Sequence, residues 1–263
     1  MVAALPARRG RLKLEIVSHC WNYAHLLAYQ LSSLVLAPPK GMSVRMTVCH
    51  CSEDKGTGAL LDFFAAQAVP GVTWNWMGLR REELMRRAIG RNRAALATDA
   101  DWLWFTDCDL VFHDGCLSRL GEILQGRADA LLFPREERCT RMLAAGDELL
   151  RAAAEKPRLV AIDASRFEAE QRSRATGPLQ IVHGDLAREL GYCAALRCYQ
   201  SPTERWRKTY EDRAFRWLLQ NDGRGIDLPG VYRIKHIAKG RYHGPGLVTR
   251  LRSGIRRLRQ PHS

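Results

Sequence analysis

The octapeptide WLWFTDCD, residues 102–109, joins an apolar run directly to two carboxylates. A continuous apolar run of this length is typical of a central strand of a parallel sheet, because such a strand is buried on both faces. Open α/β sheets bind their ligands outside the carboxyl ends of the strands. We therefore expect residues 102–106 to form a central strand and a ligand site to begin at Asp107.

Asp107 and Asp109 are two residues apart, so in an extended segment their side chains project to the same side. Two carboxylates held together repel each other unless a cation or a proton compensates, and all-oxygen ligation suits magnesium or manganese. The pattern therefore indicates a divalent metal at this pair. The alternative is that one aspartate caps the next turn while the other is solvated.

The residues before this stretch alternate between strand and helix patterns. Strands are expected at 12–17, 44–49 and 72–77, and helices before Pro38, at 58–67 and at 82–97. This alternation predicts an α/β fold with an open, mostly parallel sheet flanked by helices and joined by right-handed crossovers. The second half is less regular, with strands expected at 130–133, 159–162 and 231–235 and helices at 141–154 and 212–220.

Asn92 lies on the apolar face of the helix before the central strand, in register with Met85 and Ala88. A polar side chain on an inward face needs a hydrogen-bond partner. The neighbouring Arg91 and Arg93 favour a helix that faces an anion. The alternative is a core asparagine bonded to the backbone.

The composition fits a globular domain, since the 263 residues are 46% hydrophobic and 26% charged. The net charge of +13 gathers at the ends: residues 1–14 carry four basic and no acidic side chains, and residues 224–263 carry ten basic and one acidic. A DNA-binding domain more usually carries its positive charge across the folded body. A nucleic-acid binder is therefore a weaker alternative, which predicts salt-sensitive binding that disappears with the two ends.

The eight cysteines follow no secretory signal, so we expect reduced thiols in the cytoplasm. Cys49, His50 and Cys51, with Cys20 on the adjacent strand, match no zinc framework, and buried free thiols are favoured there. The sequence contains no run of 18 consecutive apolar residues, so it predicts no membrane span.

The stretch from Arg91-Asn92 through Asp99 and Trp102 to the D-C-D of residues 107–109 resembles the core of the GT-A fold glycosyltransferases, in particular the large inverting family 2. In that family an asparagine stands on the helix before a hydrophobic strand that ends in a D-x-D metal motif. The resemblance implies a GT-A-type nucleotide-binding α/β/α sandwich over about residues 12–245.

Two further segments carry the same resemblance. The pattern after the first strand includes Asn22, Leu27 and Leu31, and YEDRAF at 210–215 is similar to the family's E-D segment. The paired aspartates that usually follow the second strand are replaced here by CHCSED at 49–54. The Q-x-x-R-W motif of processive members is absent, which favours a single-transfer enzyme.

The resemblance implies a glycosyltransferase that moves a sugar from a nucleotide-diphosphate donor, with a UDP-linked donor favoured, to a glycan or lipid-linked acceptor with inversion. It implies that Asp107 and Asp109 hold Mn²⁺ or Mg²⁺, with His236 as a further ligand and His243 in reserve. The alternative from a different class is a non-catalytic GT-A-like protein that binds nucleotide, glycan or membrane.

The resemblance further implies that Asp212 is the catalytic base and that Glu211 orients the acceptor; ordinary capping of a helix N-terminus is the alternative. Asp185 is expected to cap a short helix that ends at Gly191, next to His183. The residues implied to bind the nucleotide sugar are Asn22, Asp54, Arg91, Asn92, Asp107, Cys108, Asp109 and His183.

We expect a basic extension at 1–11 and one catalytic domain at 12–245, divided into a nucleotide-sugar half (12–115) and an acceptor half (116–245). Residues 246–263 form a basic pattern with Leu247 and Leu251 on one helical stripe. Such a tail either lies on an anionic membrane, making the protein peripheral at its inner face, or packs on the domain.

Overall fold

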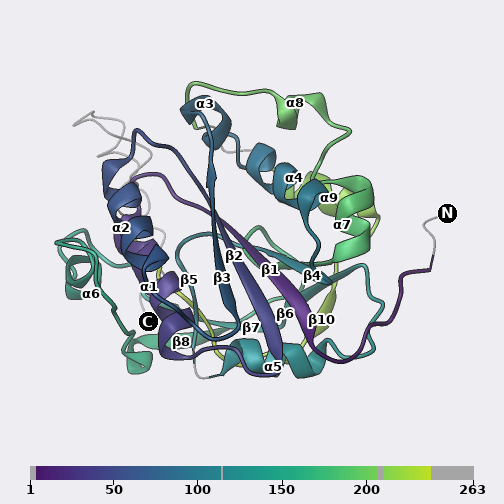
Figure 1. Ribbon diagram of the computed structural model, residues 1–263, viewed down its shortest axis with the longest axis horizontal. Coiled ribbons are helices and arrows are strands. Elements are labelled where there is room, and N and C mark those ends of the chain that lie inside the picture. Colours follow the sequence, from purple (N-terminus) through teal and green to yellow (C-terminus); the bar gives the residue numbers. More distant parts are fainter. Residues whose placement is uncertain (1–3, 114, 207–209, 238–263) are drawn as a thin grey trace.

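A seven-stranded sheet forms the centre of the fold, in the order β10-β6-β9-β4-β1-β2-β3 (Figure 1). The computed structural model describes residues 4–113, 115–206 and 210–237. The strands of this sheet are β1 (Leu12–His19), β2 (Met42–His50), β3 (Val72–Gly78), β4 (Trp102–Phe105), β6 (Leu131–Pro134), β9 (Gln180–His183) and β10 (Arg224–Ile226). Strands β1 to β4 are mutually parallel, whereas β9 runs antiparallel to both of its neighbours. The expected open, mostly parallel sheet is confirmed.

The helices form groups on either side of this sheet. They are α1 (Ala24–Leu36), α2 (Lys55–Ala65), α3 (Arg81–Leu84), α4 (Arg87–Ala97), α5 (Cys116–Ile123), α6 (Glu148–Ala152), α7 (Gly184–Leu190), α8 (Arg197–Gln200) and α9 (Glu211–Leu219), with a 3-10 turn at Ala164–Arg166. The chain steps from β1 to β2 to β3 and then returns to β4, so right-handed crossovers put α1 and α2 on one face and α4 on the other. Figure 1 shows α1 and α2 together, away from the group of α4, α7 and α9.

A second sheet of four strands lies beside the first, in the order β5-β11-β7-β8. Its strands are β5 (Leu110–Phe112), β11 (Val231–Arg233), β7 (Glu136–Thr140) and β8 (Phe167–Gln171). Strand β5 begins directly after Asp109 and pairs antiparallel with β11. The backbone N–H of Ile234 donates to the carbonyl of Asp109 at 2.9 Å. This pairing carries the late part of the chain to the end of β4.

The apolar run of residues 102–105 forms the buried centre of the sheet. Trp102, Leu103, Trp104 and Phe105 are each at most 1% exposed. The indole N–H of Trp104 donates to the carbonyl of Pro178 at 3.0 Å, so its one polar atom is satisfied. The expected central strand is confirmed.

Three expectations are wrong in detail. The single helix expected at 82–97 is divided into α3 and α4, because Arg86 has non-helical backbone angles (φ −110°, ψ 86°). The helix expected at 141–154 is reduced to α6. Residues 159–162 form no strand: the N–H of Val160 donates to Ser32 Oγ of α1 instead of to a neighbouring strand.

The short helix α7 ends at Gly191, as expected, where φ is +62°. Its N-cap is His183 rather than Asp185, because His183 Nδ1 accepts from the N–H of Asp185. The described part of the N-terminal extension lies against this helix. Arg8 pairs with both Asp101 and Asp185, so its charge is neutralised within the fold.

Gly90 marks a close approach of α4 to the central sheet. A Cβ at this position would lie 2.5 Å from His19 Nε2 and 2.7 Å from Cys49 Sγ. We expect Gly90→Ala to lower the free energy of unfolding by about 1–2 kcal/mol, since the clash outweighs the better helix propensity of alanine. Denaturant unfolding measures this change.

Gly58→Ala is the matched control, because Gly58 lies in α2 with nothing within 4 Å of its added Cβ. This variant should gain about 0.5–1 kcal/mol. Equal effects at the two glycines would contradict the close approach at Gly90.

The structure contains no helix, within the residues it describes, that is long and apolar enough to cross a bilayer.

Candidate functional site

A pocket of about 150 Å³ opens where β1 and β4 end, at the expected edge of the sheet. Asp107, Cys108 and Asp109 line it after β4, and His236 lines it after β11. The parallel register that pairs Val17 with Phe105 brings the ends of β1 and β4 side by side. The structure therefore brings together four of the residues expected at the site.

Asp107 is held by arginines. Arg87 Nη1 donates to Asp107 Oδ1 at 2.6 Å, and Arg91 Nη2 lies 3.5 Å from the same oxygen. Burial by itself would raise the pKa of Asp107, but Arg87, Arg91 and Arg233 outweigh it and hold that pKa well below its ordinary value. The carboxylate is thus ionised and already balanced by positive charge.

Arg87 also contacts the E-D segment. Its Nε lies 3.2 Å from Oε1 of Glu211, which is buried at the start of α9. One guanidinium therefore links the D-x-D pair to the segment in which the base is expected.

Arg91 and Asn92 of α4 form hydrogen bonds to Tyr192 and to the end of β4. Arg91 has no exposed side-chain surface, and its Nη1 donates to the hydroxyl of Tyr192 at 2.9 Å. Its Nη2 donates to the carbonyl of Thr106 at 3.4 Å, which fixes the end of β4. Asn92 Oδ1 accepts from the backbone N–H of Tyr192 at 2.9 Å. This contact is of the kind that the alternative interpretation of Asn92, a core asparagine bonded to the backbone, predicts.

Asn22 and Asp54 meet beside the pocket. The backbone N–H of Asn22 donates to Asp54 Oδ2 at 2.5 Å, and the other oxygen of Asp54 caps α2 through the N–H of Thr57. Asn22 has a φ of +58°, which turns the chain sharply after β1. The contact ties the loops that follow β1 and β2 to each other.

His236 lines the pocket from the segment after β11. It is buried, with its ring centroid 5.4 Å from that of Tyr23 and 6.3 Å from that of His25. Carboxylate oxygens and an imidazole nitrogen form a donor set that suits Mn²⁺ or Mg²⁺.

The donor atoms of this set are not gathered as a closed metal site. Among the described residues, Asp107, Asp109 and His236 do not form a group whose ligand atoms all lie within 4.8 Å of one another. The chemistry of the residues fits the metal, and one oxygen of Asp107 is paired with Arg87.

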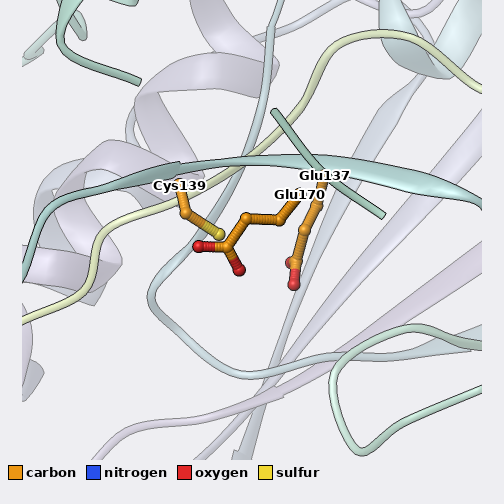
Figure 2. Close-up of side chains that lie close together, drawn as sticks. All are labelled: Glu137, Cys139 and Glu170. Atoms are coloured by element: carbon orange, nitrogen blue, oxygen red, sulfur yellow. The ribbon is translucent and has the colours of Figure 1, made fainter. Parts of the chain in front are cut away.

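A group that does meet this distance criterion lies in the second sheet, at Glu137, Cys139 and Glu170 (Figure 2). Arg172 contacts both carboxylates, at 2.5 Å from Glu137 and 2.6 Å from Glu170. Arg233 and Lys235 add further positive charge, and burial raises the pKa of the Cys139 thiol to about 12. With the carboxylates paired to three cations and the thiol protonated, this cluster is an ion-pair network of the small sheet.

Asp212, the candidate base, and its neighbour Glu211 contact different arginines. Asp212 Oδ2 lies 3.5 Å from Arg216 Nη1, and 27% of its side chain is exposed. Gln180 donates to its backbone carbonyl at 3.4 Å. Glu211 is instead the residue that reaches Arg87 at the pocket.

The structure separates His183 from the D-x-D pair. His183 is paired in register with Trp102, the first residue of β4, because β9 runs antiparallel. Its Nε2 lies 3.1 Å from the carbonyl oxygen of Pro6. The expected binding residue therefore lies at the opposite end of β4. His243 and the tail at 246–263 lie outside the described residues.

Sequence reasoning missed several residues of the pocket, Arg87 and His19 above all. Arg87 precedes Arg91 by four residues, and this helical spacing signals a shared face. His19 ends β1 at the same edge of the sheet as Asp107. Burial, then Arg91 and Arg87, hold the pKa of His19 well below its ordinary value, so a neutral imidazole lines the pocket.

This sheet order, with a D-x-D pair at the end of its central strand, defines a GT-A-type fold like that of family 2 glycosyltransferases. The family model described as Glycosyl transferase family 2 matches residues 49–142, which include the end of β2, strands β3 to β7 and the D-x-D pair. No curated protein matches the chain.

The comparison with solved structures matches S. aureus TarS, and the complex with UDP-GlcNAc shares the architecture. TarS 1-349 in complex with UDP-GlcNAc has a TM-score of 0.56 and 12% sequence identity, covering 89% of this chain and 62% of that one. TarS 1-349 alone has a TM-score of 0.48 and 13% identity, covering 86% of this chain and 58% of that one. The chain thus spans about three fifths of the length of these structures.

Proposed function

We propose that this chain is a glycosyltransferase that takes a sugar from a nucleotide-diphosphate donor, with UDP as the nucleotide. The D-x-D pair at the end of β4, in one pocket with His236, is the observation that carries the proposal. The match to the family model and the GT-A-type fold support it. The UDP-GlcNAc bound by the similar TarS structure supports a uridine nucleotide.

Asp107, Asp109 and His236 are proposed to hold Mn²⁺ or Mg²⁺ against the diphosphate. The bound metal would act as a Lewis acid that neutralises the departing diphosphate. Arg87 adds positive charge in the same pocket. Asn22 and Asp54 are proposed to contact the nucleotide from the loops after β1 and β2.

Inversion requires an acceptor hydroxyl to attack the anomeric carbon from the side opposite the diphosphate. A base must take the hydroxyl proton as the new bond forms. Asp212 is proposed for this step, since its carboxylate keeps solvent access and stands next to Glu211, which faces the pocket through Arg87. A single transfer to a glycan or lipid-linked acceptor completes the proposed reaction.

Thermal unfolding with UDP, GDP and CDP, each with and without Mn²⁺, tests the donor site without knowledge of the acceptor. Ligands that bind only the folded state raise its midpoint. We expect UDP with Mn²⁺ to raise the midpoint by several degrees and each compound alone to raise it far less. Absence of a shift with every nucleotide would reject the donor site. A shift without sugar transfer to any acceptor would favour a non-catalytic nucleotide-binding protein.

A further inference from the structure

Arg87 is positioned between the two acidic segments of the pocket. Its Nη1 lies 2.6 Å from Asp107 Oδ1 and its Nε lies 3.2 Å from Glu211 Oε1, so different nitrogens of one guanidinium serve the two carboxylates. A quarter of the side chain remains exposed, and it lines the pocket. Arg87 can therefore reach an incoming anion without leaving its helix.

Arg87 and Arg91 both contact Oδ1 of Asp107, so a metal at this carboxylate would share it with the two arginines. Cations that share one carboxylate repel each other, so each arginine at Asp107 lowers the affinity of that carboxylate for a metal. Arg91 is fully buried and held by Tyr192 and Thr106, so it stays beside Asp107. Arg87, with a quarter of its side chain exposed, is thus the one of these two arginines that can leave Asp107 for another anion.

We propose that Arg87 is a positioning residue that exchanges partners: it holds Asp107 against metal in the free protein and moves to the donor diphosphate when metal takes Asp107. This inference rests on the proposed donor site. The diphosphate offers Arg87 a new anionic partner, and arginine pairs with phosphate oxygens through several N–H groups. The contact with Glu211 stays as the pivot of the exchange.

The exchange makes metal and nucleotide bind cooperatively. Metal alone weakens the contact of Arg87 with Asp107 and offers no new anion, whereas metal with diphosphate gives Arg87 a replacement for Asp107. By linkage, the nucleotide then raises the affinity for metal by the same factor by which metal raises the affinity for nucleotide. Loss of Arg87 should reduce this factor.

Titration calorimetry of Arg87→Gln with Mn²⁺ alone, UDP alone and the two together tests the exchange. We expect Mn²⁺ alone to bind about five- to tenfold tighter than to the wild type, because one of the two competing arginines is gone. UDP in the presence of Mn²⁺ should bind about tenfold more weakly, because the diphosphate loses a cation. If Arg87 had a merely structural role, its loss would weaken both the binding of Mn²⁺ alone and the binding of UDP in the presence of Mn²⁺.

Arg93→Gln is the matched control. Arg93 lies on the same helix and carries the same charge, but its contact is with Glu83 at 2.6 Å. This variant calibrates the effect of removing a positive charge from α4. Arg87→Lys keeps the charge but cannot bridge two carboxylates with a planar fork, so it should fall between the wild type and Arg87→Gln.

Unchanged or weaker binding of Mn²⁺ alone in Arg87→Gln, or a gain no larger than that in Arg93→Gln, overturns the exchange. Circular dichroism confirms that each variant is folded, and Arg87→Lys provides the same comparison if Arg87→Gln is not. The Mn²⁺ measurement needs no sugar transfer, so its result is separate from the proposed activity. If wild type binds neither Mn²⁺ nor UDP, the donor site itself fails.

Discussion

Asp109→Ala is expected to abolish the stabilisation by UDP with Mn²⁺ and to lower kcat/KM for the sugar donor by about 10³-fold or more. The variant removes one of the two carboxylates of the D-x-D pair at the pocket. Since the other carboxylate is paired with Arg87, a metal would be left with a weakened donor set. The loss corresponds to several kcal/mol of stabilisation of the leaving diphosphate.

Thermal unfolding and initial rates with a UDP-sugar measure the two parts of this result. Asp227→Ala is the matched control, because Asp227 is exposed and pairs with Arg135 in a surface contact. It should leave the shift and the rate unchanged. A full shift by UDP with Mn²⁺ in Asp109→Ala would show that the metal, where it binds at all, does not use the D-x-D pair.

The centre of the fold could be predicted because each of its signals is local. The apolar run at 102–105 defines a buried strand, and the strands at 12–17, 44–49 and 72–77 are separated by helical patterns. Right-handed crossovers then make these strands parallel, so that their carboxyl ends lie at the same edge of the sheet as Asp107. This reasoning needs no contact between distant segments, which is why the D-x-D pair could be placed at the pocket from sequence.

The second sheet could not be predicted in the same way. Strands β7 and β8 carry charged residues. Their carboxylates are neutralised by Arg172, which directly follows β8, and by Arg233 and Lys235, which come from a distant part of the chain. Their pattern therefore lacks the apolar alternation of a half-buried strand. The same limit applies to Glu211, whose role as the partner of Arg87 depends on a contact across 124 positions.

His183 illustrates how strand direction changes a functional assignment. A parallel β9 would have carried its last residue to the pocket edge with Asp107. The antiparallel direction instead pairs His183 with Trp102 at the other edge, where it caps α7. Direction is set by the connections and by partner strands, and the sequence of β9 alone, QIVH, contains no sign of it.

Asp212→Asn is expected to lower kcat by about 10²- to 10⁴-fold while leaving the binding of UDP with Mn²⁺ unchanged, because the amide keeps the shape of the side chain but cannot accept a proton. Glu211→Gln should differ in kind. Glu211 is buried against Arg87, so losing its charge should weaken donor binding together with turnover. Initial rates at varied donor concentration, with the thermal shift by UDP and Mn²⁺, separate the two patterns.

Asp222→Asn decides whether Asp212 acts on the acceptor or merely through Arg216. Arg216 contacts both aspartates, Asp222 through Nε at 3.0 Å and Asp212 through Nη1 at 3.5 Å. If Asp212 serves only to hold this guanidinium, the loss of the closer partner should reduce kcat at least as much. If Asp212 is the base, Asp222→Asn should retain nearly full turnover, and the pH profile should lose its acidic limb only in Asp212→Asn. Equal losses in the two variants would remove Asp212 from the proposed mechanism and leave the donor site intact.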